Sequence, residues 1–100
     1  MEIENPIKLL ELTERVLSAQ LEELSALHVR LNILENADIN DFVDNDAPKF
    51  KQTADYATTE KTIAIINCKK RIINLEGEIE GAKMTISELN DTITGKKNDE

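Results

Sequence analysis

The residues of this chain whose types could do chemistry are one histidine, one cysteine and a cluster of acids. His28 and Cys68 belong to different predicted helices. A catalytic cysteine needs a base beside its sulfur, and a zinc site needs further histidines or cysteines at ligand spacing. Neither arrangement is present, so we expect His28 to lie at the edge of an apolar helix face. We expect Cys68 to be a small buried side chain.

The acidic cluster has the composition of a calcium site but not its pattern. Its members are Asp38, Asn40, Asp41, Asp44 and Asp46. An EF-hand loop counted from Asp38 needs glycine at its sixth position and glutamate at its twelfth. Those positions hold Val43 and Lys49. We therefore expect no metal site, and we expect these side chains to cap helices and form turns.

Other catalytic patterns are missing from the sequence as well. It contains no glycine-rich phosphate loop, no nucleophile elbow and no pair of carboxylates that a pocket would bring together. Two long helices also offer little concave surface for a substrate. The sequence predicts a protein that is not an enzyme and needs no cofactor.

The composition is typical of long helices that pack side by side. The chain has no tryptophan, one tyrosine, two phenylalanines, three glycines and two prolines in 100 residues. No apolar run is long enough to span a bilayer, and the acidic start MEIENP lacks the regions of a signal peptide. A single cysteine cannot form an internal disulfide. We expect an all-α cytoplasmic protein that does not enter a membrane.

The net charge of −8 is unevenly distributed. Residues 1–47 carry 11 acids and 3 bases, whereas residues 48–100 carry 9 of each. A strongly acidic half argues against nucleic-acid binding, which requires lysines and arginines that neutralise phosphates. It is compatible with a solvated acidic face, or with a basic protein as partner.

The elements that hold these residues are two predicted helices in a single helical-hairpin domain, residues 1–100. The first covers about residues 6–35, with Asn5 as N-cap and Pro6 in its first turn. Its apolar face comprises Leu10, Leu17, Leu21, Leu24, Leu27, Leu31 and Leu34. That face is broadened by Leu9, Leu12, Val16, Val29 and Ile33. This is more apolar surface than one partner helix would cover.

An acidic loop, residues 36–47, follows the first helix. We expect Asp38 to cap a short turn that ends at Phe42, and Pro48 to begin a second helix of residues 48–94. Gly95 has the position of a C-terminal cap, and the tail, residues 95–100, is predicted to be disordered. The aromatic residues Phe42, Phe50 and Tyr56 surround this loop. They either close the end of the hairpin or serve as anchors for a partner.

The second helix carries apolar residues at alternating spacings of three and four, typical of a coiled coil. They are Ile65, Cys68, Ile72, Leu75, Ile79, Ala82, Ile86, Leu89 and Ile93. Helices of about 45 Å and about 70 Å would leave the residues beyond about 80 without a partner in an antiparallel hairpin. We therefore expect this stripe to bind a second chain in a coiled-coil dimer or small bundle, while Ile66 and Ile73 pack on the first helix. The alternative is a hairpin within one chain whose ends are frayed.

The residues beside the stripe favour a parallel dimer. In that arrangement Arg71 of one chain would meet Glu76 of the other, and Glu78 would meet Lys83. Isoleucine at one stripe position and leucine at the next also favours two parallel strands. The two Cys68 sulfurs would then approach one another.

Two functional hypotheses follow. The first is a coiled-coil module for protein–protein interaction, such as an assembly chaperone, a scaffold subunit or a small regulator, in a phage or a low-GC bacterium. The second is an acidic inhibitor whose first half occupies the basic, nucleic-acid-binding groove of a target protein. The partner in either case is another protein whose identity the sequence does not give.

Overall fold

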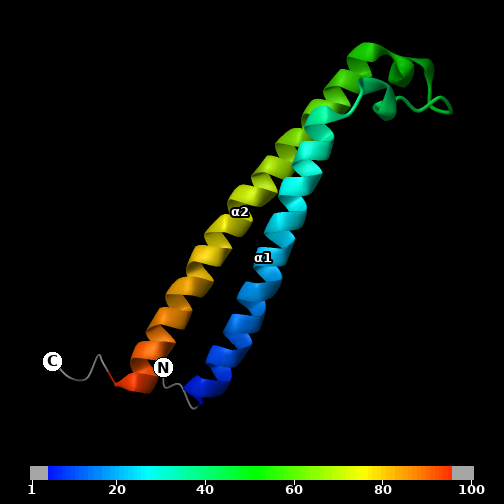
Figure 1. Cartoon of the computed structure of the whole chain (residues 1–100). Coiled ribbons are helices and arrows are strands. Elements are labelled where there is room, and N and C mark those ends of the chain that lie inside the picture. Colours follow the sequence, from blue (N-terminus) through cyan, green and yellow to red (C-terminus); the bar gives the residue numbers. More distant parts are fainter. Residues whose placement is uncertain (1–4, 96–100) are drawn as a thin grey trace. The chain divides into compact units, whose positions relative to one another are not determined.

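The computed structural model describes residues 5–95, and the regular structure in that range is entirely helical. Its long helices are α1 (Pro6–Asn36) and α2 (Ala54–Thr94), which form a helical hairpin (Figure 1). Two short 3₁₀ turns, η1 (Ile39–Phe42) and η2 (Lys49–Gln52), lie between them. The predicted all-α fold with two long helices is confirmed.

Helix α1 begins as its sequence predicts. The amide of Lys8 donates to Oδ1 of Asn5 at 3.0 Å, and the amide of Leu9 donates to the Asn5 carbonyl at 3.1 Å. Asn5 therefore satisfies amide groups that have no partner inside the helix. The helix ends at Asn36, one residue beyond the predicted boundary.

The connection between the helices is longer than predicted, because α2 does not begin at Pro48. Pro48 opens the turn η2, and Thr53 then adopts an extended conformation with φ −82° and ψ 152°. The Thr53 hydroxyl accepts a hydrogen bond from the Tyr56 amide at 3.2 Å, so Thr53 is the cap from which α2 begins at Ala54. The predicted short turn is confirmed, since Asp38 Oδ1 accepts from the Asn40 amide at 2.9 Å.

Helix α2 ends at Thr94, as predicted. Gly95 follows with φ +74°, a left-handed conformation that glycine adopts without steric cost. The rest of the tail predicted to be disordered lies outside the described residues.

The chain divides into two compact units. The loop unit is Ser25–Ile73, and the terminal unit combines the described residues up to Leu24 with those from Asn74 onward. In the loop unit the helices run antiparallel, as two hydrogen bonds show together. The Cys68 thiol donates to the Leu27 carbonyl at 3.5 Å, whereas the ammonium of Lys61, earlier in α2, donates to the carbonyl of Glu35, later in α1, at 3.3 Å. Its buried apolar residues are Leu27, Ala57, Cys68 and Ile72.

The terminal unit buries the part of α2 that was expected to lack a partner. Ile79 is 4% exposed and Leu89 is 2% exposed within the single chain. The prediction that residues beyond about 80 have no partner in the hairpin is therefore wrong. Helix α2 starts later than predicted, and Lys61 is the residue that meets the end of α1, so the turns of α2 that extend past α1 are those before Lys61.

Candidate functional site

The stripe of residues 65–93 faces the interior of the hairpin; we call it the inner stripe. Within the single chain Cys68, Ile72, Leu75, Ile79 and Leu89 are buried, and Ile65, Ala82 and Ile86 are half-buried. Ile93, the last member, is exposed. The inner stripe already has a partner in its own chain, and a parallel dimer through it would require α2 to leave α1.

Helix α1 supplies the opposing surface with the same alternating spacing. Leu27 is buried, and Leu10, Leu17, Leu24, Leu31 and Leu34 are half-buried, whereas Leu21 is exposed. The positions between them that sequence reasoning passed over are Thr13 and Gln20, both half-buried. The spacing alone identifies these two positions, because they complete the alternation of three and four residues that starts at Leu10. Gln20 Oε1 is buried without a hydrogen-bond partner in the described part of the chain.

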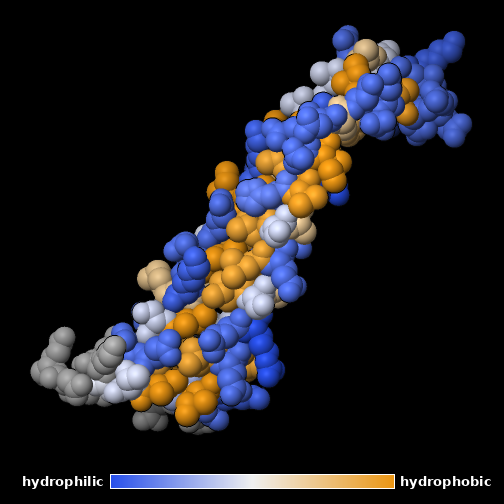
Figure 2. Space-filling view, in the orientation of Figure 1, coloured by the Kyte–Doolittle hydropathy of each residue, from blue (hydrophilic) through white to orange (hydrophobic). Residues whose placement is uncertain are grey.

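A second apolar line on α1 is exposed, and we call it the outer stripe: Leu9, Leu12, Val16 and Ala19. Leu9 is 41% exposed, Leu12 is 43% exposed and Val16 is 52% exposed. Each lies one position before a residue of the inward-facing line. Val29 and Ile33 are also exposed, which confirms that α1 carries more apolar surface than α2 covers. Figure 2 shows apolar side chains reaching the molecular surface among the polar ones.

Helix α2 also has exposed apolar side chains on the side away from its inner stripe. They are Ile63, Ile66, Ile73 and Met84. The expectation that Ile66 and Ile73 pack on the first helix is wrong. Each follows an inward-facing residue directly in sequence, and a step of about 100° turns the side chain out of the interface.

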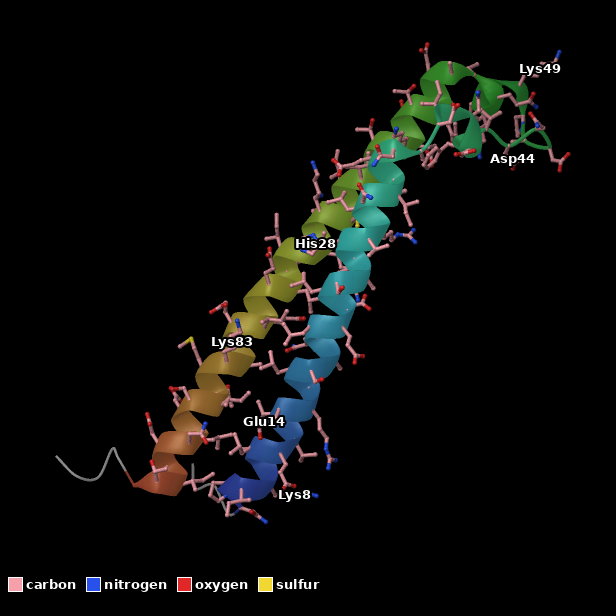
Figure 3. All side chains as sticks on the ribbon, in the orientation of Figure 1. Lys8, Glu14, His28, Asp44, Lys49 and Lys83 are labelled. Atoms are coloured by element: carbon pink, nitrogen blue, oxygen red, sulfur yellow. The ribbon has the colours of Figure 1, made fainter. Side chains whose placement is uncertain are left out.

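The charged residues predicted to pair between chains lie on the surface of α2. Arg71, Glu76, Glu78 and Lys83 are all exposed. Figure 3 shows Lys83 on α2, and its ammonium is 3.7 Å from Oε1 of Glu80, three residues earlier on the same helix. An exposed pair of this kind contributes little to stability.

The three aromatic residues differ in exposure. Phe50 is 62% exposed, whereas Phe42 and Tyr56 are half-buried. The rings of Phe50 and Tyr56 meet edge to face at 5.9 Å, and the Lys51 ammonium lies 5.9 Å and 6.0 Å from the two ring centroids. Phe50 therefore joins a small aromatic cluster and still leaves apolar area exposed to solvent.

The residues singled out for chemistry are not brought together as a catalytic group. His28 is exposed on α1 (Figure 3), while the buried thiol of Cys68 is engaged by the Leu27 carbonyl. A groove of about 330 Å³ in the loop unit is lined by Leu27, Arg30, Ala64, Asn67, Cys68 and Arg71. No base faces the Cys68 sulfur among those residues. Within residues 5–95 no three of the His, Cys, Asp and Glu side chains form a group that could hold a metal ion.

Comparison with protein-family models, with curated proteins and with solved structures finds no match for this chain. Within the described residues, neither helix contains a stretch long and apolar enough to cross a membrane.

Proposed function

We propose that this protein is a non-enzymatic, cytoplasmic module for protein–protein interaction that binds through the outside of its hairpin. The observation that carries the proposal is the outer stripe. Leu9, Leu12 and Val16 stay exposed at helical spacing after the hairpin has covered its own interior. A partner helix that covered them would remove apolar area from water, which is the main driving force of protein association.

The proposed partner surface is therefore the outside of the hairpin and not the inner stripe. A parallel dimer through the inner stripe would expose the α1 face that covers that stripe, so each chain would lose apolar burial before it gained any. Mild oxidation of the intact chain tests that arrangement. Rapid formation of a Cys68–Cys68 disulfide would support it, whereas slow formation that follows global unfolding would support the outer surface.

Site-specific photo-cross-linking in lysate of the source cells tests the proposed function. A benzophenone amino acid at Val16 is expected to give cross-linked protein adducts. The same group at Ser18, which is exposed and lies off the stripe, is expected to give few. Equal adduct yields at the two positions, or none at Val16, would contradict the proposal.

A second candidate, the acidic inhibitor, is favoured by the exposure of Glu11, Glu14 and Glu22 on α1. A basic groove that bound these carboxylates would be recognised mainly by charge, so the complex would weaken as salt rises. Reversal of Glu11, Glu14, Glu22 and Glu23 to lysine would abolish such binding. Binding through the outer stripe would instead tolerate salt and fail after Leu12→Asp.

A further inference from the structure

We propose that the outer stripe binds the outer stripe of a second copy of this chain, with the two α1 helices antiparallel. The inference rests on the proposed function and names the partner. The outer stripe is complementary to itself about a two-fold axis that passes between Leu12 and Val16. Leu12 then meets Val16 of the second copy, and Leu9 meets Ala19 of the second copy. Each pair sets a larger side chain against a smaller one, and the symmetry makes every pair occur twice.

The charges beside the stripe fit the same arrangement. Three charged residues recur every seven positions on the border of the contact: Lys8, Arg15 and Glu22. Lys8 directly precedes Leu9, Arg15 directly precedes Val16, and Glu22 lies three residues after Ala19. An antiparallel pairing brings Lys8 close to Glu22 of the second copy at both ends. The two Arg15 side chains approach near the axis, but Glu11 lies four residues before each on its own helix, a spacing at which opposite charges attract.

The surface of α2 beside the stripe is consistent with a close approach by another helix. When two helices pack antiparallel, the residues that flank the core on one side of the first helix lie on the same side of the pair as the equivalent residues of the second helix. On α2 of the terminal unit those positions include the small residues Gly81 and Thr85, with the exposed acids Glu78 and Glu88 on either side of them. A Cβ added at Gly81 would meet no atom within 4 Å, so packing inside the hairpin does not require glycine there.

The molar mass of the full chain, measured by light scattering across a dilution series, tests the proposal. The expected mass at high concentration is twice the chain mass of 11.3 kDa. Val16→Asp is expected to raise the dissociation constant at least about tenfold, because it places a carboxylate at the centre of an apolar contact. Val29→Asp is the matched control, since it makes the same change at another exposed valine of α1 that lies off the stripe. Far-ultraviolet circular dichroism is expected to show the same helicity for both variants.

Two further variant pairs test the orientation without changing the fold. Lys8→Glu is expected to weaken dimerisation about fivefold, and the double variant Lys8→Glu with Glu22→Lys is expected to restore it. Gly81→Ala is expected to weaken the dimer, whereas Gly77→Ala on the outward side of α2 is expected to leave it unchanged. These exposed positions keep the test valid if Val16→Asp reduces helicity.

Three outcomes would overturn the inference: a monomer at every concentration, equal effects of Val16→Asp and Val29→Asp, or no rescue by the charge swap. A monomer whose Val16 cross-links to a different protein would overturn the inference and leave the proposed function standing. A monomer that gives no position-specific adduct would contradict both.

Discussion

The inner stripe of α2 and the outer stripe of α1 have the same alternating spacing and opposite exposure. Leu89 on the inner stripe is 2% exposed, whereas Val16 on the outer stripe is 52% exposed. The spacing shows that each surface suits a helix packed against it. It does not show which chain supplies that helix. For the inner stripe, the late start of α2 at Ala54 and the antiparallel register give the answer: α1 of the same chain.

The largest expected difference between the stripes is in their effect on folding. Ile79→Ala is expected to lower the free energy of unfolding by about 2 to 5 kcal/mol, because it leaves a cavity in a buried contact. Leu12→Ala is expected to lower it by less than about 1 kcal/mol in the monomer, because its side chain is half in water already. Urea unfolding followed by circular dichroism at concentrations that keep the chain monomeric measures both. Equal losses of unfolding free energy for Ile79→Ala and Leu12→Ala would contradict the burial of Ile79 and the exposure of Leu12.

A second prediction concerns the loop unit, where Lys61 joins α2 to the end of α1. Its ammonium donates to the carbonyls of Glu35 at 3.3 Å and Ala37 at 2.7 Å, and it is half-buried. Lys61→Met is expected to lower the free energy of unfolding by about 1 to 2 kcal/mol, because it leaves carbonyls at the helix end without a donor. Lys69→Met, at an exposed position of the same helix, is the control and is expected to change little. If Lys61→Met lowers the free energy of unfolding no more than Lys69→Met does, these hydrogen bonds do not stabilise the loop unit.

A third prediction concerns the one polar amide on the inward-facing line of α1. Gln20 Oε1 is buried without a partner among the described residues, and an unsatisfied acceptor is costly. Gln20→Leu is expected to raise the free energy of unfolding by about 1 kcal/mol, measured by urea unfolding. A destabilised variant would show that the amide makes a favourable contact in solution.

The smallest expected effects are those of the glycines. Gly95→Ala is expected to cost about 1 kcal/mol, because φ is +74° at that position. Gly77→Ala is expected to stabilise the monomer by about 0.5 to 1 kcal/mol, because a Cβ there meets nothing within 4 Å and alanine favours helix. Thermal unfolding of the two variants should therefore shift in opposite directions. Shifts of the same sign would contradict the helix end at Thr94.

The sequence predicts most of the features that depend on neighbouring residues. Asn5, Asp38 and Gly95 act as the caps their types suggest, because each bonds within a few residues or needs only its own φ. The predicted start of α2 at Pro48 is wrong, because proline is compatible with the first turn of an α-helix and with a 3₁₀ turn. Thr53 was overlooked although it is a good cap residue.

The features that depend on distant residues were not predictable. Lys61 reaches carbonyls that lie 24 and 26 residues earlier, and no local pattern marks it. For the same reason the sequence alone does not show that the partner of the inner stripe is α1 of the same chain. The pairing of residues such as Leu89 with α1 depends on a register that the connection fixes, and the length of that connection was underestimated.

Amide hydrogen exchange tests most directly whether a single chain covers its own inner stripe. The measurement would use the Val16→Asp chain at concentrations where light scattering gives 11.3 kDa. Amides around Leu89 are expected to stay protected in this monomeric chain, as those around Ile72 do, because α1 still covers both. Loss of protection around Leu89 in that monomeric chain, with protection around Ile72 retained, would contradict it and would return the inner stripe to a second chain.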